Sequence, residues 1–137
     1  MNLPGRTASL VVAGAFVATL AGCSIDAVIW GQDGAHVIET TERLIDAAAS
    51  GEQHALVCDG ADPGLGEPQD WKGLSAGEPE HFHADYWADQ ASLDPAWNIN
   101  LELEYAVAGY VFPGDVFYRD TENGLCVVDV VWSMVAR

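Results

Sequence analysis

The chain has 137 residues, half of them hydrophobic, and a formal net charge of −16 at pH 7. All 21 acidic side chains follow Cys23, but only four basic ones do (Arg43, Lys72, Arg119 and Arg137), which leaves that part at −17. Such a surface repels nucleic acid and anionic lipid head groups, so a phosphate-backbone partner is excluded. A solvated acidic shell is the interpretation we favour, with a dedicated cation-binding surface as the alternative.

The basic start MNLPGR and Thr7 are followed by an uncharged apolar segment over residues 8–20. As a helix it would span about 20 Å, which is short of the roughly 30 Å hydrocarbon thickness of a bilayer. A basic start, a short apolar core and small residues at its exit are typical of a secretory signal. We therefore expect residues 1–22 to be a cleaved signal peptide.

The end of this segment is Leu20, Ala21, Gly22 and Cys23, which resembles the lipobox of bacterial lipoproteins. The resemblance implies that the Cys23 thiol receives a diacylglyceryl group and that the signal peptidase cleaves just before it. Two acyl chains hold a protein stably on a membrane. We expect residues 23–33 to be a lipidated tether on the outer face of the cell membrane. An ordinary secretory signal or a short signal anchor is the alternative.

Two cysteines remain once Cys23 carries lipid, namely Cys58 and Cys126. In an exported domain an isolated pair predicts a disulfide. The bond would close a loop of roughly 70 residues, for which the chain-entropy stabilisation is about 4 kcal/mol. Two reduced thiols are the alternative, which the absence of Cys-x-x-Cys spacing disfavours. Low lysine with abundant alanine and glycine resembles an actinobacterial protein.

Residues 34–137 read as one domain that starts with helices. Asp33 can cap a helix that ends at Ser50-Gly51, and its apolar face is formed by Val37, Thr41, Leu44, Ile45 and Ala48. A short helical segment follows over residues 52–58. The stretch 59–80, rich in Gly, Pro and acid, predicts a long loop, which in a compact domain is usually functional or mobile. A helix of about two turns is expected over residues 79–90.

The last third has the alternation of β-strands. We expect strands over residues 97–104, 105–112 and 115–120, with a turn at Pro113-Gly114 and a type I′ turn at Glu122-Asn123-Gly124. The final strand, residues 125–135, is the most apolar, so we expect it at the centre of the sheet.

Helices followed by an antiparallel meander predict an α+β fold. The element order over residues 35–135 resembles that of cone-shaped NTF2-like and cystatin-like lipoproteins, in which an N-terminal helix packs on a curved antiparallel sheet. In that arrangement Cys58 reaches Cys126 on the last strand. Asp129, which interrupts that strand, either faces the mouth of the cone with a raised pKa or points outward. Simple alternation places Cys126, Val128 and Val130 on the opposite face and favours the outward orientation.

No residue set predicts catalysis or a cofactor. His81 and His83 are candidate metal ligands, but the helix expected there separates them, and two partly exposed histidines are the favoured interpretation. Aromatic side chains are numerous, and any that line a groove beside the long loop would suit a small ligand or a protein partner. We expect a ligand- or protein-binding module at the cell envelope. The alternative is a small-molecule lyase or isomerase acting in a cone cavity.

Overall fold

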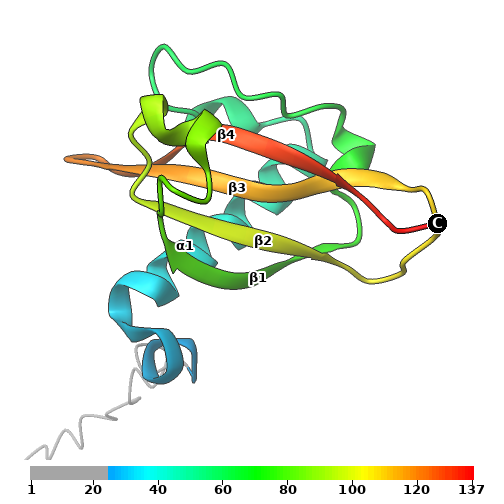
Figure 1. The fold of residues 1–137 in the computed structure, drawn as a ribbon, viewed down its shortest axis with the longest axis horizontal. Coiled ribbons are helices and arrows are strands. Elements are labelled where there is room, and N and C mark those ends of the chain that lie inside the picture. The colour runs from blue at the N-terminus through cyan, green and yellow to red at the C-terminus, as the bar shows by residue number, and fades with distance from the viewer. Residues whose placement is uncertain (1–24) are drawn as a thin grey trace, which may run out of the picture.

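The computed structural model describes residues 25–137, so the predicted signal peptide, the lipobox and Cys23 lie outside the described residues. One long helix precedes a sheet of four antiparallel strands in the order β1-β2-β3-β4 (Figure 1). The helix and strands are α1 (Ile25–Ala49), β1 (Leu74–His81), β2 (Trp97–Leu103), β3 (Val111–Thr121) and β4 (Gly124–Met134). Three short 3₁₀ helices lie between them, namely η2 (Gln53–Leu56), η3 (Pro68–Trp71) and η4 (Ala88–Leu93). The α+β class expected from the sequence is confirmed.

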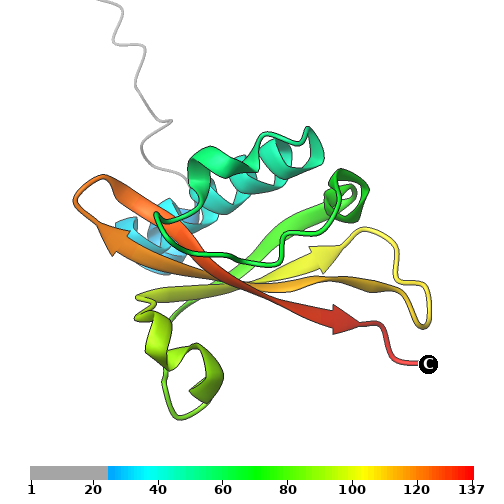
Figure 2. The ribbon, with the colours of Figure 1, turned by 90° about the horizontal axis from the view of Figure 1, so that it is seen from above.

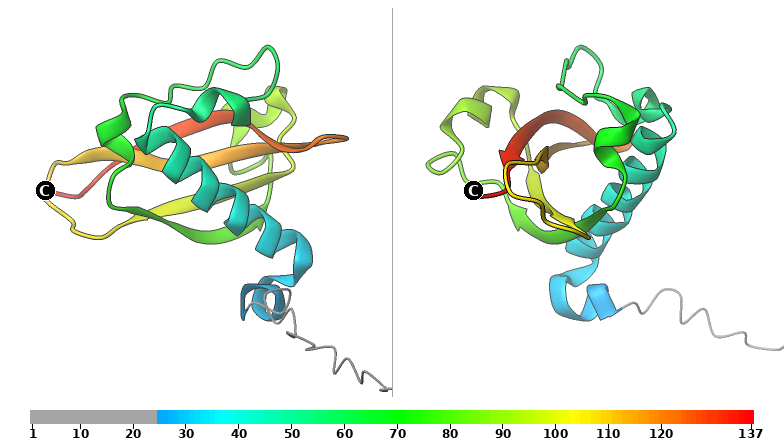
Figure 3. Two further views of the ribbon diagram at one scale, coloured as in Figure 1. Left: turned by 180° about the vertical axis from the view of Figure 1, so that it is seen from behind. Right: turned by 90° about the vertical axis from the view of Figure 1, so that its right-hand side faces the viewer.

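The sheet curves around α1, which lies on its concave side. The segment between β1 and β2, residues 82–96, contains η4 and lies on the convex side (Figure 3). The core between helix and sheet contains the fully buried Val37 and Leu44 of α1 against Ile99 and Val116 of the sheet. Each such side chain contributes about 1.5–3 kcal/mol of hydrophobic free energy. Thr41, also buried in this core, forms a 2.8 Å hydroxyl–hydroxyl hydrogen bond with Tyr118. This hydrogen bond pairs two buried hydroxyls across the core, whereas the buried Thr40 Oγ1 of α1 has no hydrogen-bond partner.

Helix α1 begins at Ile25, eight residues before the expected cap at Asp33, and includes part of the stretch expected to be a tether. The two parts meet at Gly31, whose φ of 75° and ψ of 173° break the helical geometry. Glycine adopts this conformation without the steric penalty of a Cβ atom. Trp30 packs on the core and so holds the first part of the helix against the domain. Within residues 25–137, no helix combines the length and apolarity needed to cross a membrane.

The prediction of a long loop over residues 59–80 is wrong for the second half of this range, which forms η3 and β1. A capping box starts η3, because the Glu67 and Asp70 side chains each accept a hydrogen bond from the other residue's backbone N–H. Strand β1 tolerates Pro79 because it is an edge strand, where one side of the backbone needs no ladder hydrogen bonds. The irregular chain between η2 and η3 is therefore much shorter than expected.

The helix expected over residues 79–90 and the strand expected over 105–112 are also wrong. The first range holds the end of β1, a turn and the start of η4, and the second is mostly the loop that joins β2 to β3. Pro113 and Gly114 do not turn the chain. They lie inside β3 at a bulge, where a Cβ on Gly114 would be 2.0 Å from the Ser133 hydroxyl. The glycine is required by this close approach rather than by a turn.

Two expectations for the last hairpin are also corrected. Strand β4 lies at the edge of the sheet, not at its centre, and its apolar edge is partly covered by Val57, which bridges to Val127. The hairpin turn is not type I′, since Glu122 and Asn123 have negative φ and only Gly124 has a positive value, 101°. A type I turn followed by a left-handed glycine is the common three-residue alternative.

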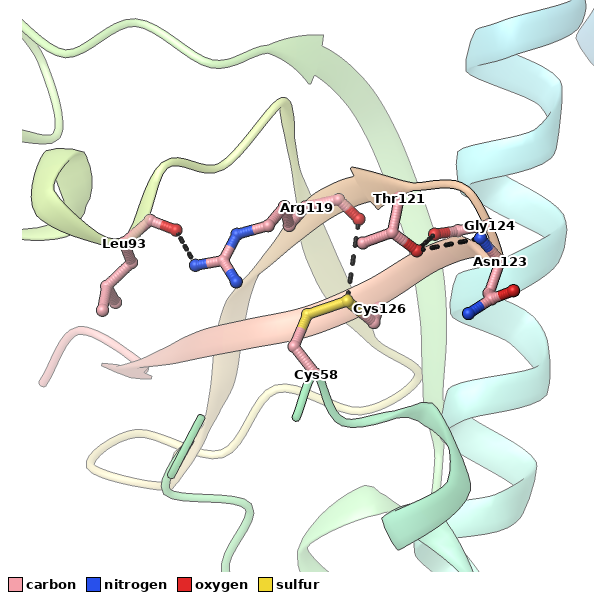
Figure 4. Close-up of a disulfide and its surroundings, with 7 residues drawn as sticks. All are labelled: Cys58, Leu93, Arg119, Thr121, Asn123, Gly124 and Cys126. Carbon is pink, nitrogen blue, oxygen red and sulfur yellow. Dashed lines mark hydrogen bonds between the residues drawn. A yellow bond between two sulfur atoms is a disulfide. The ribbon is translucent and has the colours of Figure 1, made fainter. Parts of the chain in front are cut away.

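A disulfide joins Cys58, just after η2, to Cys126 on β4, with the two Cα atoms 4.9 Å apart (Figure 4). The bond lies in a second apolar cluster on the convex face of the sheet, together with Phe117 and Val128. It ties the segment that covers the edge of β4 to that strand.

Replacing Cys58 and Cys126 by alanine should lower the melting temperature by at least about 10 °C, because the loss of about 4 kcal/mol in loop-closure entropy shifts Tm by several degrees per kcal/mol. Circular dichroism melts with and without reductant measure the effect. Cys23→Ala is the matched control and should melt as the parent does. A double variant that melts at the parent temperature would contradict the bond's role.

Candidate functional site

The convex face of the sheet carries a cleft of about 650 Å³. The lining residues come from strands β1, β2 and β3, which form the floor, and from the segment of residues 82–96. Figure 2 shows this segment, with η4, on the side of the sheet away from α1. Its lining is acidic, amide and aromatic: Glu78, Glu80, His83, Tyr86, Trp87, Asn98, Asn100 and Asp115. Volumes of about 300–1,000 Å³ are usual for sites that bind small organic molecules.

Strand register brings the polar side chains of the floor together. Glu80 of β1 pairs with Asn98 of β2, and Asn100 of β2 pairs with Asp115 of β3. Successive side chains of a strand point to opposite faces. Asn98 and Asn100 therefore face the cleft while Ile99 between them enters the core under α1.

A bulge in β1 sets the position of Glu78. Gly77 and Glu78 together oppose Asn100, since Ala76 pairs with Leu101 and Pro79 with Ile99. A Cβ on Gly77 would lie 2.4 Å from Asn100 Nδ2, so only glycine fits there. The Glu78 N–H donates to Asn100 Oδ1 at 2.8 Å. This hydrogen bond fixes the amide and the bulge in one arrangement.

The aromatic side of the cleft is held in place by packing. The Trp87 ring stands edge-on to the buried Phe117 of β3 at a centroid distance of 4.9 Å, and Tyr86 packs on Trp87 at 5.1 Å. Arg119 of β3 donates a hydrogen bond to the Leu93 carbonyl at the end of η4 (Figure 4). The segment is thus attached at both its aromatic and its C-terminal part, so the protein's own contacts hold the aromatic side of the cleft in place.

Asp115 is a lining residue whose pKa is strongly raised. Burial, and then the neighbouring carboxylate of Glu80, raise the pKa of Asp115 from 3.8 to about 6. Both causes disfavour its ionised form. A cation in the cleft would oppose both and restore the carboxylate.

Asn98 has a buried side-chain oxygen, Oδ1, without a hydrogen-bond partner. The side chain is only 3% exposed. An unpaired buried acceptor costs about 1–3 kcal/mol. A donor from a ligand in the cleft would remove that cost.

The two candidate metal ligands, His81 and His83, lie at different places in the structure. His83 lines the cleft, whereas His81 at the end of β1 stacks on the Trp97 ring at 3.9 Å. Among the described residues no group of three or more His, Cys, Asp or Glu side chains is arranged to hold a metal ion.

Asp129 lies on the convex face but is not part of the cleft lining. It pairs with Phe117, whose other neighbour is Asn98, so that Phe117 and the overlying Trp87 stand between Asp129 and the cleft. Its carboxylate accepts a 3.2 Å hydrogen bond from Gln90. A bulge beside Phe117 breaks the alternation of β4. Val128 and Cys126 therefore lie on the same side as Phe117, which corrects the expected placement of both on the opposite face, whereas Val130 enters the core as expected.

The sequence does not predict that the amides Asn98 and Asn100 and the carboxyl of Asp115 belong to the site. The alternation of Asn98 and Asn100 was visible, but it was interpreted only as a half-buried strand. The segment Glu78-Pro79-Glu80 has the same alternation, but it ends a stretch rich in Gly, Pro and acidic residues, which predicts a loop. No sequence pattern marks Asp115 as a site residue, because only the pairing of β2 with β3 brings it next to Asn100.

Changing Asp115 to Asn should alter the dependence of stability on pH. Because the folded pKa of about 6 lies above the ordinary 3.8, this carboxyl stabilises the fold below about pH 4 and loses that contribution as the pH rises through 6. The variant should therefore be more stable than the parent at pH 7, by about 1 kcal/mol once solvent screening of this partly exposed group is allowed for.

Urea unfolding at pH 4 and pH 7 measures the difference. Glu39→Gln, an exposed change on α1, is the control for loss of one negative charge. A variant whose advantage is the same at both pH values would contradict the raised pKa.

The chain matches no known family model, no curated protein and no solved structure.

Proposed function

We propose that the protein is an exported lipoprotein, held on the outer face of the cell membrane by lipid on Cys23, whose domain binds a small ligand in the cleft on the convex face. The lipobox resemblance of Leu20, Ala21, Gly22 and Cys23 supports the anchor. The preformed cleft supports the binding role. The cleft is the observation that carries the proposal.

The first turns of α1 also support the anchor. Ile25 and Val28 are 76% and 82% exposed, and Ile29 is 61% exposed. At positions i, i+3 and i+4 these three side chains share one face of the helix. An apolar face that starts two residues after a lipidated cysteine suits the interface of a bilayer, where such faces bury their side chains.

The fold is proposed to be of the NTF2-like or cystatin-like kind. The supporting features are the N-terminal helix on the concave side of the sheet and the meander order of its strands. The concave side is occupied by α1 and the core, which is why the proposed ligand site lies on the convex face instead of in a cone.

A lyase or isomerase activity is the second candidate, and one observation favours it. Asp115, with its raised pKa, and His83 line the same cleft. A carboxyl group whose pKa lies near the working pH is suited to general acid–base catalysis. The binding role remains the first proposal because it needs only the walls of the cleft.

Cys23→Ala should release the protein from the membrane fraction or leave its signal segment uncleaved, because no thiol remains for lipid. Cell fractionation and intact-mass analysis measure both outcomes. The parent should have a mature chain that begins at Cys23 and carries the mass of a lipid. The Cys58→Ala/Cys126→Ala variant should keep its lipid. A parent chain with unmodified Cys23 would overturn the anchor.

A further inference from the structure

The lining of the cleft holds three carboxylates, and its one basic side chain is that of His83. Glu78, Glu80 and Asp115 face the space, and none of the eight lining residues is Lys or Arg. The partly buried carboxylate of Asp115 interacts with a charged ligand more strongly than a carboxylate in water does. A cationic ligand therefore fits this lining. The charge alone leaves the chemistry of that cation undetermined.

The side chain of Asn98 indicates which class of cation fits the cleft. Its buried Oδ1 is an acceptor with no partner, next to the paired Glu80. The free energy of an unpaired acceptor is recovered by a donor, and most strongly by a charged one. A ligand with N–H groups on its cationic centre satisfies the carboxylates and this carbonyl together.

The aromatic side and the volume indicate an organic ligand. Tyr86, 78% exposed, and Trp87 present ring surface to the cleft. Aromatic rings attract ammonium groups and pack against hydrocarbon. A space of about 650 Å³ also exceeds what one hydrated metal ion fills.

We propose that the cleft binds a small organic molecule with a protonated amine, whose N–H groups donate to Asn98 Oδ1 and to the carboxylates of Glu80 and Asp115. The carbon chain of the ligand packs against Tyr86 and Trp87. This inference rests on the proposed function of the cleft as a ligand site, and it specifies the class of ligand.

Titration calorimetry on the full-length protein in detergent micelles, with spermidine as the probe, tests the inference. Glu80→Gln and Asp115→Asn should each weaken binding at least tenfold. Glu39→Gln on α1, which removes the same charge from an exposed site, should leave it within twofold. Equal weakening by all three changes would mean a diffuse attraction to an acidic protein and would overturn the inference.

Asn98→Leu supplies a second variant with an opposite signature. Leucine has nearly the shape of asparagine and removes the unpaired acceptor, so the variant should melt at or above the parent temperature. Its affinity for spermidine should nevertheless fall at least fivefold. Unchanged affinity in this folded variant would contradict the role of Oδ1.

Two further cations test whether binding requires N–H groups on an organic cation. Tetramethylammonium has no N–H group and should bind at least tenfold more weakly than methylammonium. Calcium chloride should not displace spermidine at equal concentration. Tight binding of either competitor at this cleft would overturn the assignment to a protonated amine.

Binding should weaken as the pH falls through about 6, because Asp115, whose pKa burial and Glu80 raise to that value, becomes neutral. Glu78 and Glu80 from β1 and His83 and Tyr86 from the η4 segment face the same space. Asp115→Asn should flatten this profile. An affinity that does not vary between pH 5 and pH 7 would count against the inference.

Neutral and anionic small molecules, titrated in the same way, separate this inference from the proposed function. If one of them binds and Trp87→Ala abolishes that binding, the cleft is a ligand site and only the amine assignment fails. If neither spermidine nor any of these molecules binds, both proposals fail.

Discussion

The alternation of side chains along β2 is the constraint on which the rest of the structure depends. Ile99 and Leu101 enter the core beneath α1, and the intervening Asn98 and Asn100 form the floor of the cleft. A shift of register by one residue would exchange the two sets, burying amides under the helix and exposing the core. The same pairing that stabilises the fold therefore places Glu80 and Asp115 on either side of the two amides.

The sequence was informative where one local signal sufficed. The periodicity of Val37, Leu44 and Ile45 predicted the helix, and the alternation from Trp97 onward predicted β2. It failed where glycine and proline serve strand packing instead of turns. Gly77 and Gly114 each lie against a side chain of the neighbouring strand, Asn100 and Ser133, and Pro79 is tolerated because β1 is an edge. These contacts are made between distant segments, so no window of sequence contains them. The cleft was missed for the same reason, since its residues come from three strands and a loop.

The floor of the cleft is not optimised for stability. Asp115 is held where burial and Glu80 disfavour its charge, and Asn98 has an acceptor without a partner. Natural proteins usually accept such costs where a site must be ready for a ligand. Phe117 makes this possible, because its ring supports Trp87 above the sheet and closes the cleft off from Asp129 and Gln90. The apolar cluster around Phe117, together with the disulfide, gives the polar site a rigid support.

The proposed anchor and the proposed site are connected through β1. Pro79 lies between the two cleft residues Glu78 and Glu80 and faces α1, where a Cβ on Gly34 would lie 3.5 Å from its ring. Gly34 follows the apolar turn of Ile25, Val28 and Ile29 by only a few residues, so the part of β1 that lines the cleft packs on α1 close to that turn. Anionic head groups concentrate organic cations near a membrane, while they repel the acidic domain itself. A lipid anchor on Cys23, as proposed, would resolve this conflict, because it would keep the acidic domain near the layer where its proposed ligand accumulates.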